Sequence, residues 1–171
     1  MTPILYLVIP CYNEEEVLPE TTRRLKEKFS VLTSAGRISE LSRILLVDDG
    51  SKDHTWPMIS ALAKEDCRFG GVKLSRNRGH QNALLAGLMT AKGQCDCCIS
   101  MDADLQDDIG AIDQMLDAFS EGYEVVYGVR SSRESDTFFK RSTAQGFYKF
   151  MKLMGVDIVY NHADYRLLSG R

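Results

Sequence analysis

The stretch CDCCISMDAD (95–104) decides the fold, because it joins an apolar run to two carboxylates. The run has the length and apolar content of a buried strand, and Asp102 and Asp104 come directly after it. In open α/β sheets, ligands bind beyond the carboxyl ends of the strands. The stretch therefore predicts a buried strand with a polar site at its end.

Similar apolar runs lie on both sides of this stretch and alternate with helical patterns. Further strands are predicted at 4–10, 43–49, 71–75 and 123–130. Helices are predicted at 13–29, around Pro57, at 81–91 and at 110–119. Strands that alternate with helices are typical of βαβ units. We therefore expect an α/β fold with a mostly parallel, Rossmann-like sheet flanked by helices, in a single domain spanning residues 1–171.

Composition limits the classes of function. The chain has 171 residues and a formal net charge of −3, which gives no support to general nucleic-acid binding. No apolar run approaches the ~20 residues that span a bilayer, and no signal peptide opens the chain. The five cysteines include one C-x-x-C, at 95–98, without the second ligand pair that a zinc site requires. Buried free thiols in a reducing compartment are the simpler interpretation.

Polar clusters follow the first four predicted strands. They are Asn13-Glu14, Asp48-Asp49, Arg76-Asn77-Arg78 and Asp102-Ala103-Asp104, in chain order. Because ligands bind at the carboxyl edge of such a sheet, we expect these clusters to form one site.

Asp102 and Asp104 are candidate ligands for a divalent metal. Carboxylates two residues apart can turn towards one point after a strand, and their hard oxygens suit Mg²⁺ or Mn²⁺, which also bind substrate phosphates. Gln106 can add an amide oxygen. The alternative is a solvated turn, but the position after a buried run favours a metal site.

The other clusters suit a nucleotide. Asp48 and Asp49 can accept hydrogen bonds from a base or a ribose, and they should differ in role because adjacent strand side chains point to opposite faces. Turn formation and helix capping are the alternative. A signalling receiver domain also carries early paired acids, but no Asp follows the third strand here. A helix opens with Arg76, Arg78, His80 and Gln81, and basic groups at its N-terminus can hold phosphate. Ordinary surface charge is the alternative, and His80 can also be a simple capping or packing histidine.

A further helix is predicted at 138–154, with apolar residues on one arc and basic residues on another. It can pack on the sheet, or it can contact anionic lipid through its basic face. Both interpretations stay open at this point.

Taken in order, these segments resemble the family 2 inverting glycosyltransferases of the GT-A fold. The matching segments are VIPCYNEEE (8–16), LLVDDGSKDHT (45–55), SRNRGHQNALLAGL (75–88), MDADLQDD (101–108), GVRSSR (128–133) and ADYRLLS (163–169). Each motif is weak alone, whereas the ordered set is specific and spans nearly the whole chain. The set is most similar to the branch of dolichol-phosphate mannose synthase and the bacterial polyprenyl-phosphate glucosyltransferases.

The resemblance implies roles for individual residues. Those implied at the nucleotide are Pro10, Tyr12, Glu14, Asp48, Asp49, Arg78 and Asp102, with Asp49 at the base. Asp102 and Asp104 would hold Mg²⁺ or Mn²⁺ on the diphosphate, with Gln106 beside them. The implied catalytic residues are Arg130, facing the phosphates, and Asp164, which lies with Arg166 on the acceptor side. Ile109 departs from the family, which usually has Pro there, but this change removes no ligand.

The implied function is that of a hexosyltransferase. It would move glucose from UDP-glucose onto a polyprenyl phosphate, with inversion, at the cytoplasmic face of the cell membrane. A UDP-sugar donor is favoured over a GDP-sugar, and a homo-oligomer is left open. Two alternatives remain: transfer to a saccharide hydroxyl in surface polysaccharide synthesis, and a non-catalytic module that binds nucleotide sugars. Relatives often continue into membrane helices, so a longer natural protein is expected.

Overall fold

The computed structural model describes residues 2–129 and 162–170. Within these residues, six strands form one sheet: β1 (Leu5–Cys11), β2 (Arg43–Asp48), β3 (Phe69–Lys73), β4 (Cys97–Ser100), β5 (Val125–Val129) and β6 (His162–Ser169). The strand order is β3-β2-β1-β4-β6-β5. The pairs β1–β2, β1–β4 and β2–β3 are parallel, and β6 runs antiparallel to β4. The predicted α/β fold with a mostly parallel sheet is therefore confirmed.

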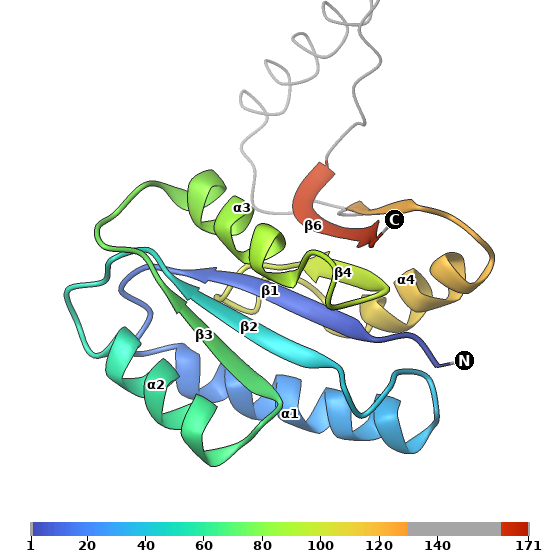
Figure 1. Ribbon diagram of the computed structural model, residues 1–171, viewed down its shortest axis with the longest axis horizontal. Helices are drawn as coiled ribbons and strands as arrows, with labels where there is room; N and C mark the ends of the chain where they lie inside the picture. The colour runs from blue at the N-terminus through green and yellow to red at the C-terminus, as the bar shows by residue number, and fades with distance from the viewer. Residues whose placement is uncertain (1, 130–161, 171) are drawn as a thin grey trace, which may run out of the picture. The chain divides into compact units, whose positions relative to one another are not determined.

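Helices cover both faces of this sheet. They are α1 (Leu18–Ser34), α2 (Thr55–Glu65), α3 (His80–Ala91) and α4 (Ala111–Ser120). Figure 1 shows α3 on one face of the parallel strands, with α1 and α2 on the other. The strand β1 lies between β2 and β4 and is buried at every position except Tyr6. An almost continuous apolar run is what a central parallel strand requires, because helices cover both of its faces.

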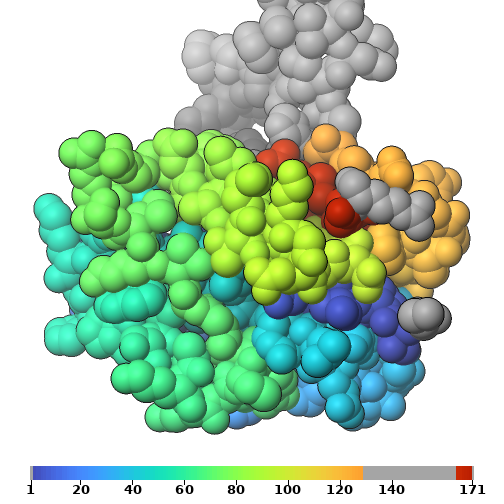
Figure 2. Space-filling model, in the orientation of Figure 1, coloured from blue at the N-terminus to red at the C-terminus, as the bar shows by residue number. Residues whose placement is uncertain are grey.

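The helix α3 packs closely on the sheet. Val8, Leu45 and Val47 form one buried cluster with Ala83 and Leu84 of the helix. A Cβ atom added at Gly87 would lie 2.4 Å from Val8 Cγ1, so the glycine permits the close approach. Figure 2 shows green and yellow-green surface over the middle of this face, with only a small dark-blue area from the start of the chain beside it.

Several predicted boundaries are wrong by a few residues, and two of these differences lie next to the candidate site. The first helix begins at Leu18 rather than at Asn13, because the residues between them form a turn and Asn13 has a φ of +55°. The strand β4 covers 97–100 rather than 95–104. Before it, the carboxylate of Asp96 accepts a hydrogen bond from the Ile4 N–H, and after it the chain turns into the acidic loop.

The strand β6 was not predicted. Its sequence, HADYRLLS, mixes polar and apolar residues without the continuous apolar run of the parallel strands. Pairing with β4 buries Tyr165 and Leu167, and this pairing joins residues that are nearly 70 positions apart. Such a long-range contact leaves no local pattern to detect.

The chain divides into two compact units, residues 1–126 with 164–171, and residues 127–163. The predicted helix at 138–154 lies outside the described residues, and the assignment of one domain to residues 1–171 stays a prediction. None of the helices in the described part is both long and apolar enough to cross a membrane.

Candidate active site at the carboxyl ends of the strands

Two cavities lie where β1, β2 and β4 end and α3 begins. The first, of about 330 Å³, is lined by Pro10, Glu14, His80, Asp102, Ala103 and Asp104. The second, of about 190 Å³, is lined by Pro10, Cys11, Tyr12, Glu14, Asp49, Asn77, Gly79 and His80. Three residues, Pro10, Glu14 and His80, line both cavities. Polar clusters from four separate sequence segments therefore meet at one edge of the sheet.

The acidic loop after β4 is held in a specific turn. Asp107 is buried, and its Oδ2 accepts a hydrogen bond from the Asp102 N–H at 3.2 Å. The Oδ1 atom of Asp104 accepts one from the Gln106 N–H at 3.1 Å. Leu105 has a φ of +58°, which is uncommon for a residue with a side chain. This strained turn presents Asp102 and Asp104 to the first cavity, whereas Gln106 is exposed and lies outside its lining.

Negative charge accumulates at this cavity. Burial raises the pKa of Glu14, and the nearby carboxylates of Asp104, Asp53 and Asp102 raise it further. Like charges held together disfavour ionisation, and a bound cation would relieve that repulsion. The cavity is therefore suited to a cation.

The donor set at this cavity fits a divalent metal. Within the described residues, no three His, Cys, Asp or Glu side chains form a complete metal-binding group. Two carboxylates are nevertheless enough for Mg²⁺, which binds through one or two carboxylates and takes the remaining ligands from substrate phosphates and water. Asp102 and Asp104 line the same cavity and provide those two carboxylates.

Asp49 holds the loop that leads into α3. It is 3% exposed, and its two oxygens accept hydrogen bonds from the N–H groups of Arg78, at 2.7 Å, and Gly79, at 2.9 Å. The neighbouring Gly50 lies against the same loop, where an added Cβ would come within 2.5 Å of the Arg76 carbonyl carbon. Asp49 also lines the second cavity, and its contact with a base stays a prediction.

Asp48 faces different surroundings, as expected for its neighbouring position on a strand. It is fully buried, and its Oδ1 accepts a hydrogen bond from the Ser51 N–H at 3.2 Å. Its Oδ2 has no hydrogen-bond partner within the described residues. Arg78 contributes only its backbone to this network, since its side chain is exposed and lies outside the linings of both cavities.

Sequence reasoning missed the residues that connect these loops. The Glu14 N–H donates to Thr55 Oγ1 at 2.8 Å, and the Glu15 N–H donates to Asp53 Oδ2 at 3.1 Å. On the other side, Thr21 Oγ1 donates to the carbonyl of Ala103 at 2.7 Å. Asp53 and Thr55 stand where a helix cap is expected, and that local signal does not reveal their second partners.

The strand β6 brings the predicted acceptor side to the same sheet. The buried Tyr165 donates a hydrogen bond from its hydroxyl to the Asp108 carbonyl at 2.9 Å, and burial raises its pKa. Arg166 is half-buried, and its Nε lacks a partner in the described part of the chain. The backbone of Asp164 belongs to β6, but its side chain and the whole of Arg130 lie outside the described residues.

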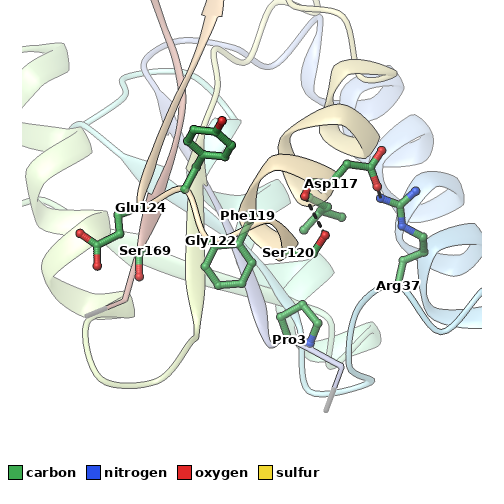
Figure 3. Close-up of a pocket in the computed structure, with 10 residues that line it drawn as sticks. Pro3, Arg37, Asp117, Phe119, Ser120, Gly122, Glu124 and Ser169 are labelled. Atoms are coloured by element: carbon green, nitrogen blue, oxygen red, sulfur yellow. Dashed lines mark hydrogen bonds and ion pairs between the residues drawn. The ribbon is translucent and has the colours of Figure 1, made fainter.

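A larger cavity, of about 420 Å³, lies near the start of β1 and the end of α4. Figure 3 shows Arg37 pointing towards Asp117, and these two side chains form an ion pair at 2.5 Å. Phe119 and Pro3 line the same cavity. None of the predicted site residues in the described part of the chain lines this cavity, and Arg37, the basic residue in its lining, is already paired with Asp117. The cavities at the carboxyl ends of the strands are therefore the better candidates for the active site.

Comparison with known proteins identifies the family of the chain. Glycosyl transferase family 2 matches residues 6–169 of the chain. The "Uncharacterized glycosyltransferase YkoT" of Bacillus subtilis (strain 168) is 53% identical over 99% of this chain and 50% of the relative. The "Prophage bactoprenol glucosyl transferase homolog" of Escherichia coli (strain K12) is 38% identical over 95% of this chain and 51% of the relative. The chain spans about half the length of the curated relatives that it matches.

Solved structures share the fold. The mannosyltransferase PcManGT from Pyrobaculum calidifontis, in complex with GDP-Man and Mn²⁺, has a TM-score of 0.66 at 16% identity, covering 99% of this chain and 45% of that one. Glucosyl-3-phosphoglycerate synthase from Mycobacterium tuberculosis, in complex with Mn²⁺, UDP and phosphoglyceric acid, has a TM-score of 0.61 at 19% identity, covering 98% and 56%. The chain belongs to glycosyl transferase family 2 and has the GT-A fold.

Proposed function

We propose that this chain transfers a hexose, glucose from UDP-glucose, onto a polyprenyl phosphate at the cytoplasmic face of the cell membrane. The observation that carries the proposal is the meeting of Asp102, Asp104 and Glu14 at one cavity, beside a second cavity that ends in Tyr12 and Asp49. A metal diphosphate suits the first cavity and a nucleoside the second. The name of the relative at 38% identity supports glucose and bactoprenol.

The reaction is a direct displacement with inversion. A phosphate oxygen of the acceptor forms a bond to the anomeric carbon while the bond to the nucleoside diphosphate breaks, so UDP leaves with the bonding electrons. A divalent metal supplies charge stabilisation for the departing diphosphate. In this proposal Asp102 and Asp104 orient the diphosphate, and Arg130 adds positive charge from outside the described part.

The acceptor determines how much a catalytic base contributes. A polyprenyl phosphate is already largely ionised at pH 7, because its second pKa is about 6. Asp164 then positions the acceptor rather than removing a proton. Transfer to a saccharide hydroxyl would instead require a general base during attack.

Asp164→Asn is expected to lower glucose transfer about 100-fold while UDP-glucose binding changes less than twofold, because the residue acts on the acceptor side. Transfer to polyprenyl phosphate and calorimetric affinity for UDP-glucose would be measured on the same preparation. An equal loss of donor affinity would place Asp164 at the donor instead.

The proposed function is tested by calorimetry of the chain with UDP, UDP-glucose and GDP-mannose, first with Mn²⁺ and then with EDTA. Metal-dependent binding of UDP and UDP-glucose is the expected result, and Asp104→Asn should abolish the dependence on metal. Asp117→Asn, an acid in the cavity near the start of β1, is the matched control. Tighter binding of GDP-mannose than of UDP-glucose would contradict the assignment of UDP-glucose as the donor. Binding of UDP that is the same with Mn²⁺ and with EDTA would contradict the assignment of the metal site.

A further inference from the structure

We propose that His80 is a donor-positioning residue whose imidazole holds the diphosphate between the nucleoside and the metal-binding carboxylates. This inference rests on the proposed function, and it chooses one specific role for a residue that the sequence left open between phosphate binding, capping and packing.

His80 stands at the junction of the two cavities. It is one of three residues that line both, together with Pro10 and Glu14. Its Nε2 atom lies 3.7 Å from Asp102 Oδ1, so the ring is beside a carboxylate assigned to the metal. A donor that places its nucleoside in one cavity and its metal-bound phosphates in the other must pass this junction.

Among these three residues, the imidazole alone can donate a side-chain hydrogen bond to a phosphate oxygen. Pro10 has no polar side-chain atom, and a Glu14 carboxylate accepts hydrogen bonds and repels phosphate. The pKa of Glu14 is raised by burial and by its acidic neighbours, so this cavity already holds an excess of negative groups. A nitrogen donor at the junction counters that repulsion where the phosphates have to cross it.

Hydrogen bonds of the backbone before and after His80 fix its position. It is the first residue of α3, and the backbone of the two preceding residues is bound by the buried carboxylate of Asp49. Gly79 precedes the helix with a φ of +87°, a conformation that favours glycine. Its carbonyl accepts hydrogen bonds from the N–H groups of Asn82 and Ala83 at 3.0 and 3.1 Å. The ring therefore projects from an anchored helix start rather than from a free loop.

The test separates phosphate binding from nucleoside binding. The full 171-residue chain and its His80→Ala and His80→Gln variants would be titrated with UDP by calorimetry and with uridine by ligand-detected NMR, both with Mg²⁺, which is diamagnetic. The control is His54→Ala, since the His54 side chain is 84% exposed, pairs with Glu15 and lines neither cavity. Thermal unfolding of each variant reports whether it is folded.

His80→Ala is expected to lower the affinity for UDP about tenfold, because one hydrogen bond to a charged group is lost. The affinity for uridine, which has no phosphate, should change less than about twofold. His80→Gln, which keeps an amide donor, should recover part of the UDP affinity, and His54→Ala should leave both ligands unchanged. Unchanged UDP affinity in His80→Ala, or an equal loss for uridine, would overturn the role of His80. A parent chain that binds neither ligand would overturn the proposed function as well, and only that outcome does so.

Discussion

At the scale of single residues, Asp48 and Asp49 show how neighbours in the sequence come to serve different purposes. Asp48 is the last residue of β2 and its carboxylate is buried beside Ser51, whereas Asp49 follows the strand and its carboxylate binds the loop before α3. Asp49 is thus a structural clamp for two backbone N–H groups as well as part of the cavity wall. A residue of this kind links the stability of the fold to the shape of the site.

Asp49→Asn is expected to destabilise the chain by about 1–3 kcal/mol, because the amide nitrogen of Asn cannot accept a hydrogen bond and one buried N–H loses its partner. UDP affinity should fall with it, since the loop carries His80. Urea unfolding and calorimetry measure the two effects. Glu40→Gln, at an exposed acid, is the control, and an unchanged unfolding free energy in Asp49→Asn would contradict the clamp.

At the scale of elements, α3 must approach the sheet closely for its first residue to reach the site. Gly87 faces Val8 and Val47, and an added Cβ would lie 2.4 and 2.8 Å from their methyl groups. The helix therefore depends on a small residue at its centre, although glycine is otherwise unfavourable within a helix.

Gly87→Ala is expected to destabilise the chain by about 1–3 kcal/mol through overpacking, despite the higher helix propensity of alanine. Thr90→Ala, at an exposed position on the same helix, should change stability by less than about 0.5 kcal/mol. Chemical denaturation of both variants provides the comparison. A more stable Gly87→Ala would show that the sheet can move away from the helix.

Asp66 connects α1 with the end of α2. It pairs with Arg68 at 2.6 Å and with Lys26 of α1 at 3.1 Å. Hydrogen bonding from Arg68 and, to a lesser extent, from Lys26 lowers the pKa of Asp66 against the opposing effect of burial. A carboxyl whose folded pKa is lowered adds stability above its unfolded value and loses that contribution as the pH falls through the folded value.

Asp66→Asn should therefore lower the unfolding free energy by about 1 kcal/mol at pH 7, since solvent weakens a partly exposed pair. The difference from the parent chain should shrink below the ordinary pKa of 3.8. Urea unfolding at pH 7, 5 and 3 measures it, with Glu65→Gln as a control at the adjacent exposed acid. If the difference in unfolding free energy between the parent chain and Asp66→Asn grows towards pH 3, the ion pairs of Asp66 do not stabilise the folded chain.

At the scale of the whole molecule, the burial of each cysteine shows which parts of the chain the fold removes from solvent. The predicted burial of free thiols is confirmed for Cys11, Cys97 and Cys98 and is wrong for Cys67, which is exposed after α2. Burial raises the pKa of Cys97 to about 12, and it raises the pKa of Cys11 and Cys98 as well. Only thiolates react rapidly, so these three groups should be inert in the folded chain.

Ellman's reagent at pH 8 is expected to label Cys67 rapidly, because this thiol is exposed. Cys95 is half-buried and burial raises its pKa, so it should react more slowly, and the three buried cysteines should react only after unfolding in guanidinium. Cys67→Ser should remove the fast phase and leave the rest unchanged. Rapid labelling of a buried thiol in the folded chain would show that the sheet opens.

The sequence alone determined the parts of this protein that have local causes. Continuous apolar runs predicted the inner parallel strands β1, β2 and β4, because a strand covered on both faces must be apolar throughout. The acids after those runs predicted that polar side chains gather at one edge of the sheet, and two cavities lie there, because the carboxyl ends of parallel strands meet at that edge. The ordered motifs predicted the family.

Tertiary structure decided the features that depend on contacts between distant segments. The pairing of β6 with β4, the clamp from Asp49 to the loop before α3, and the place of His80 beside Asp102 each join parts of the chain that no local pattern relates. Hydrogen bonds and close packing form only once the sheet brings these segments together, so their partners cannot be identified from composition or periodicity.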